Sequence, residues 1–173
     1  MNIFLIGYRG TGKTTIGRML AKRLAMDFLD SDDLIEEREG RKIKEIFERE
    51  GEPYFRGVEK AVFDGIGKLD GKVVACGGGA VLDPSNISVM RKGIVVLLEA
   101  DVETIYGRIS RSMKNSDRPA LTGLPAEAEI KELLAKRKPF YQGAAHHTIN
   151  TAELSKEEAV AKIEGLVRCQ GCS

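Results

Sequence analysis

The stretch Gly7-Tyr8-Arg9-Gly10-Thr11-Gly12-Lys13-Thr14 decides the fold, because it matches the phosphate-loop pattern G-x-x-x-x-G-K-[ST]. The apolar run at residues 3–6 precedes it and is typical of a strand. Residues 15–24 follow it with the apolar spacing of a helix. Strand, loop and helix in this order are the context that the motif requires. We therefore predict a nucleoside triphosphate site at this first strand–helix junction.

The residue types of this loop suit phosphate binding. Glycines let the backbone curl, so that its N–H groups and those at the start of the helix point at an anion. Lys13 is expected to reach the outer phosphates, and the Thr14 hydroxyl to ligate Mg²⁺. The residues predicted to bind the nucleotide here are Gly10, Thr11, Gly12, Lys13, Thr14 and Thr15.

Length and composition predict one domain spanning residues 1–173, and we expect a monomer. The net charge of +1 gives no basic face for duplex nucleic acid, so no nucleic-acid partner is expected. No apolar run approaches the roughly 20 residues of a membrane span, so no membrane partner is expected either. The first strand begins almost at Met1, which leaves no room for a targeting segment and predicts a cytoplasmic protein.

Strand-like and helix-like segments alternate along the chain. The predicted strands are 3–6, 28–29, 73–76, 94–98 and 147–150. The predicted helices are 14–24, 33–38, 43–49, 52–68, 85–91, 102–111, 125–141 and 155–169. This alternation predicts an α/β fold, a parallel sheet with helices on both faces, in which ligands bind beyond the carboxyl ends of the strands.

Many phosphate-loop ATPases carry a magnesium-binding carboxylate at the end of a second apolar strand. In this sequence the acidic residues follow a different strand. The strand at 73–76 ends in three glycines, whereas Asp30 and Asp32 follow the strand at 28–29. One Asp is expected to orient Mg²⁺ through water, and the other to accept a hydrogen bond from a substrate hydroxyl. The alternative is helix capping by Ser31, Asp32 or Asp33, which is compatible with both roles.

The triple glycine at 77–79 lets a small, oxygen-rich substrate approach the backbone, although a tight turn without a ligand is the alternative. Arg56 and Glu59 are spaced to pair on one helix face, but taken alone they are better explained as a solvated surface pair. Composition alone does not select Arg137 from its basic cluster. The polar stretch 112–125 is predicted to be a lid rather than a tolerated surface loop, because Arg118 is placed to act as an arginine finger.

The three cysteines do not form a disulfide framework. Cys76 ends an apolar strand and is predicted to be a buried thiol. The pair Cys169 and Cys172 is predicted to be an exposed, reduced tail rather than a metal or redox site.

Taken together, these motifs resemble the shikimate kinase family over nearly the whole chain. The pieces that carry the resemblance, in chain order, are Gly7–Thr14, Gly17–Ala21, Asp30–Asp32, Ile43–Phe47, Gly51-Glu52, Phe55-Arg56, Glu59, Gly77–Gly79, Arg118-Pro119, Arg137 and Tyr141. The resemblance implies transfer of the ATP γ-phosphate to the 3-hydroxyl of shikimate, in aromatic amino-acid biosynthesis. It also implies a three-layer fold of the nucleoside-monophosphate-kinase type, with a five-stranded parallel sheet in the order 2-3-1-4-5.

The resemblance further implies a role for each matching residue on the acceptor side. Asp32 hydrogen-bonds the accepting hydroxyl and is the candidate base. Arg56 and Arg137 bind the shikimate carboxylate, and the backbone at 77–79 (Gly77, Gly78, Gly79) contacts the ring. The acceptor-binding helices then occupy residues 32–60.

On the ATP side, the resemblance implies that Lys13 bridges phosphates and that Asp30 supports Mg²⁺ through water, beside Thr14. Arg118 closes with the lid onto the phosphates. Arg111, or less favourably Arg108, covers the adenine.

The sequence departs from the family pattern at two positions, and it leaves other functions open. Ala120 stands where a leucine is more usual, and Arg9 occupies a phosphate-loop position expected to be small or apolar. A kinase acting on a gluconate-like acid or a nucleoside monophosphate is the closest alternative. A regulatory ATPase is a further alternative, but it would carry an acid after the strand at 73–76, and this sequence has none there. An inactive relative is disfavoured because Lys13 and Asp32 are both present.

Overall fold

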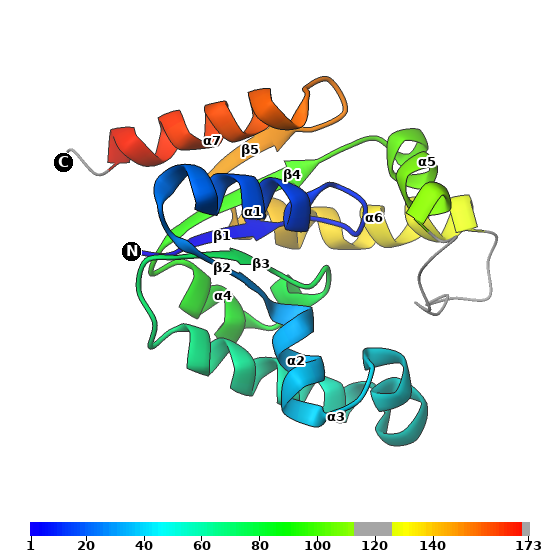
Figure 1. Cartoon of the computed structure of the whole chain (residues 1–173). Helices are drawn as coiled ribbons and strands as arrows, with labels where there is room; N and C mark the ends of the chain where they lie inside the picture. Colours follow the sequence, from blue (N-terminus) through cyan, green and yellow to red (C-terminus); the bar gives the residue numbers. More distant parts are fainter. Residues whose placement is uncertain (113–125, 171–173) are drawn as a thin grey trace.

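The computed structural model describes residues 1–112 and 126–170 and shows a twisted sheet between two layers of helices (Figure 1). The five strands run parallel in the order β2-β3-β1-β4-β5, as predicted. Their bounds are β1 Ile3–Ile6, β2 Asp27–Asp30, β3 Lys72–Ala75, β4 Ile94–Glu99 and β5 His147–Asn150.

Helices cover both faces of the sheet (Figure 1). Helices α1 and α7 contribute to the apolar core on one face, and α3, α4 and α6 contribute to the core on the other. Among the described residues the helices are α1 Lys13–Leu24, α2 Ser31–Glu39, α3 Ile43–Ile66, the 3₁₀ turn η1 Ala80–Leu82, α4 Pro84–Met90, α5 Val102–Ser112, α6 Ala126–Ala144 and α7 Lys156–Gln170.

The central strands read as continuous apolar runs because both of their faces are buried. In β1, Ile3 and Leu5 join the core under α1 and α7, whereas Phe4 and Ile6 join the opposite core. Successive strand residues point to opposite faces, so four apolar residues supply both cores at once. The same alternation recurs in β4.

Helix α3 contains a break that the sequence indicated as two separate helices, 43–49 and 52–68. Gly51 has φ 81° and ψ 175°, far outside the helical region, and the chain kinks there. A positive φ of this size favours glycine, which lacks the Cβ that crowds the backbone. The second half of α3 therefore starts in a new direction, and it carries Arg56 and Glu59.

None of the helices within the described ranges is long and apolar enough to cross a membrane. Residues 113–125, which include Arg118 and nearly all of the predicted lid, lie outside the described residues, as does Cys172.

Candidate phosphoryl-transfer site

The phosphate loop links the end of β1 to the start of α1, and glycine geometry shapes it. Gly10 has φ 82° and Gly12, the residue before α1, has φ 98°. A Cβ on Gly7 would lie 2.3 Å from the Leu98 carbonyl oxygen of neighbouring β4. The Thr11 hydroxyl donates to the Tyr8 carbonyl at 2.8 Å, which closes the curl. Glycine geometry and this hydrogen bond therefore hold the loop in its curled shape.

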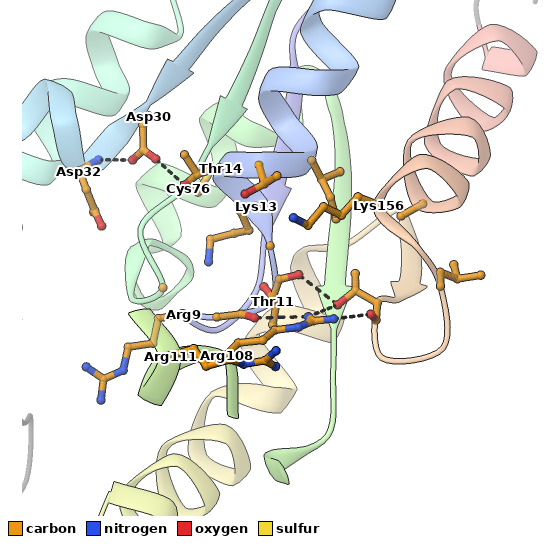
Figure 2. Close-up of a pocket in the computed structure, with 18 of the residues that line it drawn as sticks. Arg9, Thr11, Lys13, Thr14, Asp30, Asp32, Cys76, Arg108, Arg111 and Lys156 are labelled. Atoms are coloured by element: carbon orange, nitrogen blue, oxygen red, sulfur yellow. Dashed lines mark hydrogen bonds between the residues drawn. The ribbon is translucent and has the colours of Figure 1, made fainter. Parts of the chain in front are cut away.

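A cavity of about 670 Å³ opens above this loop at the carboxyl edge of the sheet (Figure 2). Its lining brings together the phosphate loop, the residues after β2 and β3, helix α5 and the start of α7. The lining residues used below are Arg9, Lys13, Thr14, Asp30, Asp32, Gly78, Arg108 and Arg111.

Lys13 lies folded over its own loop. Its Nζ donates to the carbonyl oxygens of Gly7 at 2.8 Å and Tyr8 at 2.9 Å. An ammonium in this position adds positive charge beside the N–H groups of the loop. It can exchange two neutral carbonyl acceptors for charged phosphate oxygens, with which its hydrogen bonds are stronger.

Thr14, Asp30 and Asp32 form a connected chain across the cavity (Figure 2). The Thr14 hydroxyl donates to Asp30 Oδ2 at 2.9 Å, and Asp30 Oδ1 accepts from the Asp32 backbone N–H at 3.1 Å. Asp30 is thus the N-cap of α2. The sequence pointed to Ser31, Asp32 or Asp33 as the cap, and that assignment was wrong by one residue. The cap fixes Asp30 beside Thr14 and leaves the Asp32 side chain outside the capping interaction.

The Ser31 side chain instead connects β2 to the triple glycine. The Gly77 N–H donates to Ser31 Oγ at 2.8 Å, and Ser31 is fully buried. This contact brings Asp32 against the glycines, because a Cβ on Gly77 would lie 2.6 Å from Asp32 Oδ1. Sequence reasoning missed this role of Ser31, whose only signal was its place between two Asp residues.

Arg56 reaches the same glycines from α3. It donates to Glu59 Oε2 at 2.8 Å and to Glu52 Oε1 at 3.0 and 3.2 Å. The Glu59 side chain is 1% exposed, and its burial raises the carboxyl pKa while the Arg56 charge opposes that rise. A Cβ on Gly79 would lie 2.7 Å from the Arg56 guanidinium. The predicted Arg56–Glu59 pair therefore exists, and it is half-buried rather than a solvated surface pair.

Arg137 and Tyr141 approach the triple glycine from α6. Arg137 donates to the Gly78 carbonyl oxygen at 3.2 Å, and the Tyr141 hydroxyl donates to the same oxygen at 2.5 Å. Burial raises the pKa of Tyr141 to about 12, so its hydroxyl remains protonated and able to donate at neutral pH. Arg56 and Arg137, two cations from different helices, thus lie beside one glycine turn, and sequence spacing alone did not pair them.

Arg108 of α5 connects the phosphate loop to the residue that follows β5. It donates to the Gly10 carbonyl at 3.4 Å, to the Thr151 hydroxyl at 3.0 Å and to the Thr151 carbonyl at 2.7 Å. The buried Thr151 hydroxyl donates toward the Thr11 carbonyl at 3.0 Å. Thr151 was missed from the sequence, and its one signal was a polar side chain directly after β5. Arg111 lies one turn further along α5, exposed at the cavity rim.

Cys76 also lines the cavity, as a buried thiol with a pKa raised by burial, in agreement with its predicted packing role. Cys169 is exposed, as predicted.

The family model for shikimate kinase matches residues 9–167 of this chain. The shikimate kinase of Caldanaerobacter subterraneus subsp. tengcongensis is 44% identical over 163 residues, covering 94% of this chain and 93% of the relative. The solved shikimate kinase from Acinetobacter baumannii, in complex with shikimate, superposes with a TM-score of 0.89 at 38% identity, covering 98% of this chain and 93% of that one. The Aquifex aeolicus enzyme gives a TM-score of 0.80 at 29% identity, covering 100% and 99%. The chain therefore belongs to the shikimate kinase family and has the shikimate kinase activity of the shikimate pathway.

Proposed function

We propose that this chain transfers the γ-phosphate of Mg²⁺-bound ATP to the 3-hydroxyl of shikimate, giving shikimate 3-phosphate and ADP. One observation carries the proposal. Asp32, Arg56 and Arg137, from three different helices, converge on the glycine turn at 77–79, beside the phosphate loop. That arrangement offers an acid-binding and hydroxyl-binding site next to a triphosphate site.

The two arginines suit the shikimate carboxylate. Each guanidinium presents several donors in a plane, and such donors form strong, charge-assisted bonds with carboxylate oxygens. Glu52, one turn before Arg56, and Glu59, one turn after it, hold the guanidinium in place, so that its remaining donors have a defined direction. The glycines keep side chains out of the space between Arg56 and Arg137, where the backbone of Gly77, Gly78 and Gly79 contacts the ring of the acceptor.

Asp32 is the residue that meets the accepting hydroxyl. Its carboxylate accepts the hydrogen bond of the 3-hydroxyl, turns the oxygen toward the γ-phosphate and takes the proton as the new ester forms. Positioning and charge stabilisation dominate phosphoryl transfer, and the Asp32 carboxylate contributes through its charge, which orients the hydroxyl and receives its proton. Lys13 shifts from the Gly7 and Tyr8 carbonyls to the phosphates, where its charge opposes the negative charge of the transferring group.

The oxygen-rich pair Thr14 and Asp30 fits a magnesium site. Mg²⁺ takes oxygen ligands, keeps several waters and uses few protein ligands beside substrate phosphates. The Thr14 hydroxyl is placed to ligate the ion directly. Asp30, whose Oδ2 lies 2.9 Å from that hydroxyl, is placed to hold a water of the ion. When bound, the ion neutralises charge on the phosphate oxygens.

We further propose that Arg118 acts on the phosphates and that Arg111 covers the adenine. The exposed position of Arg111 at the cavity rim supports its role, and Arg108 is engaged with Gly10 and Thr151 instead. A monomer of one domain is proposed because every described site residue lies in or beside one cavity of a single chain. The free, exposed thiol of Cys169 suits a reducing, cytoplasmic location.

Identification of the product tests this proposal. The chain is incubated with ATP, Mg²⁺ and shikimate, and the product is analysed by mass spectrometry and ³¹P NMR. We expect one new phosphate ester whose phosphorus couples to the proton on ring carbon 3, and no product when EDTA removes the metal. An ester on another hydroxyl would disprove the assignment of the acceptor oxygen, and undiminished turnover in EDTA would disprove the magnesium role.

A further inference from the structure

Arg9, the unexpected residue in the phosphate loop, makes a partly buried ion pair with helix α6. Its guanidinium donates to Glu129 Oε1 at 2.9 Å, and the Glu129 side chain is only 1% exposed. The two residues are 120 positions apart in the chain. In Figure 2 the Arg9 side chain extends away from Lys13 and Thr14, so its charge is directed at the protein and not at the phosphate-binding atoms. Arg9 therefore has a partner of its own outside the nucleotide site.

A buried carboxylate is costly to desolvate, and the pair that compensates it ties its two elements together. Here the elements are the phosphate loop and the first turn of α6. The same helix carries Arg137 eight residues later, about 12 Å along its axis. Because a helix is rigid over two turns, fixing Glu129 also limits where Arg137 can lie.

Tyr8 provides a second contact between the same elements. The Arg9 and Arg137 guanidinium carbons each lie 5.9 Å from the Tyr8 ring centroid, within the range of a cation–π contact. Tyr8 is 1% exposed and packs with Ile130 of α6. Arg137 is thus supported on the phosphate loop itself and, on its other side, donates to Gly78.

We propose that Arg9 and Glu129 are positioning residues, which lock the phosphate loop to α6 and thereby hold Arg137 at the acceptor site. The inference rests on the proposed role of Arg137 in binding shikimate. On this account the geometry of acceptor binding depends on the Arg9–Glu129 pair, whereas the binding of ATP does not.

The phosphate loop keeps its shape through other bonds when the pair is removed. Thr11 closes it on Tyr8, Thr151 binds the Thr11 carbonyl and Arg108 binds the Gly10 carbonyl. None of these bonds involves Arg9 or Glu129. Loss of the pair should therefore disturb Arg137 more than the nucleotide-binding backbone.

The test compares the steady-state kinetics of four variants and one control variant with those of the unsubstituted chain. Arg9→Gln and Glu129→Gln each remove one charge, and the double variant removes both, so that no buried carboxylate is left without the Arg9 charge. Arg9→Lys restores the charge and is the rescue variant. Arg168→Gln is the matched control, because it removes an arginine from an exposed ion pair with Glu164 on α7.

We expect Arg9→Gln and Glu129→Gln each to raise the shikimate KM about tenfold, within the usual range of coupling between sites. The ATP KM and kcat should change less than about threefold. The double variant should be no worse than either single variant, since both remove the same interaction. Arg9→Lys should recover most of the loss.

Two results would overturn the inference: a shikimate KM unchanged, as in Arg168→Gln, or equal rises in both KM values, which indicate a general structural role. If the unsubstituted chain does not phosphorylate shikimate, the proposed function is wrong and this inference is wrong with it. If the unsubstituted chain phosphorylates shikimate normally and the variants are unaffected, this inference is wrong but the proposed function stands.

Discussion

At the scale of single residues, two aspartates separated by one position have different contacts because of one helix cap. Asp30 is committed by its bonds to Thr14 and to the Asp32 backbone. The Asp32 side chain, in the first turn of α2, instead lies against Gly77 on the acceptor side of the cavity. The local geometry of β2 and α2 thus supports the proposed division, in which Asp30 serves the metal side and Asp32 the hydroxyl.

Replacing Asp32 by Asn tests this division. Asn keeps the size of the side chain but removes the charge and the ability to accept a proton, so kcat should fall on the order of 10²–10⁴-fold. ATP affinity, measured by nucleotide titration, should stay within about threefold because Asp30 and the phosphate loop are unchanged. Near-normal turnover would contradict the role of Asp32 at the hydroxyl.

Replacing Arg137 by Ala should weaken acceptor binding selectively. Loss of charge-assisted hydrogen bonds, worth about 1.5–3 kcal/mol, predicts a shikimate KM raised about 10- to 100-fold. The ATP KM should change little. Lys136→Ala is the control, since Lys136 lies next to Arg137 on α6 but pairs with Glu132 at the surface. Equal effects on both substrates would place Arg137 in the phosphate site instead.

At the scale of elements, the glycine turn after β3 acts as a spacer between helices. Gly77 leaves room for Asp32, and Gly79 leaves room for Arg56. The atoms nearest to Gly79 belong to the far end of a long side chain, which can move without disturbing the backbone. We therefore expect the turn to affect the positions of the proposed acceptor-binding groups more than the stability of the fold.

Gly79→Ala should displace the Arg56 guanidinium from Glu59. We expect the shikimate KM to rise about tenfold, the effect of a lost charge-assisted hydrogen bond, while the free energy of unfolding changes by less than about 1 kcal/mol. Gly65→Ala is the control, because it lies on α3 with nothing within 4 Å of the added Cβ. Kinetics like those of Gly65→Ala would show that Arg56 does not depend on the turn.

Local sequence signals were sufficient for the elements and insufficient for the contacts between them. Apolar runs located all five strands, and the bounds of β2, β3 and β4 differ from the prediction by one residue at one or both ends. The cap at Asp30 was missed because Ser31 and Asp33 are residue types that cap helices equally well. The Ser31 side chain instead accepts from the Gly77 N–H, a contact that the local sequence does not reveal. The Arg9–Glu129 pair joins residues 120 positions apart, which no local pattern encodes.

At the scale of the whole molecule, the strand order places the two half-sites side by side. Strand β1 carries the phosphate loop and lies between β3, which carries the glycine turn, and β4. In such a sheet the crevice lies where the direction of winding reverses, next to the first strand. The order 2-3-1-4-5 came from the family resemblance, because periodicity predicts a parallel sheet but not which strands are neighbours.

The sheet edge also predicts how stability depends on pH. Partial burial lowers the pKa of His146 from its usual 6.5, and its Nδ1 accepts from the Val95 N–H at 3.1 Å. Because the unfolded chain then binds a proton more readily than the folded chain, stability should fall as the pH drops through about 6.5. Urea unfolding from about pH 7.5 to about pH 5.5, on either side of that value, measures this slope. His146→Gln should flatten it, and an unchanged slope would contradict the assignment.

The most direct test of the central claim is acceptor-dependent ADP release with ATP and Mg²⁺. Shikimate, gluconate, a panel of nucleoside monophosphates and no acceptor are compared under the same conditions. We predict strong stimulation by shikimate and only background release with the others. Stimulation by gluconate or a nucleoside monophosphate, without a response to shikimate, would contradict the acceptor site built on Asp32, Arg56 and Arg137.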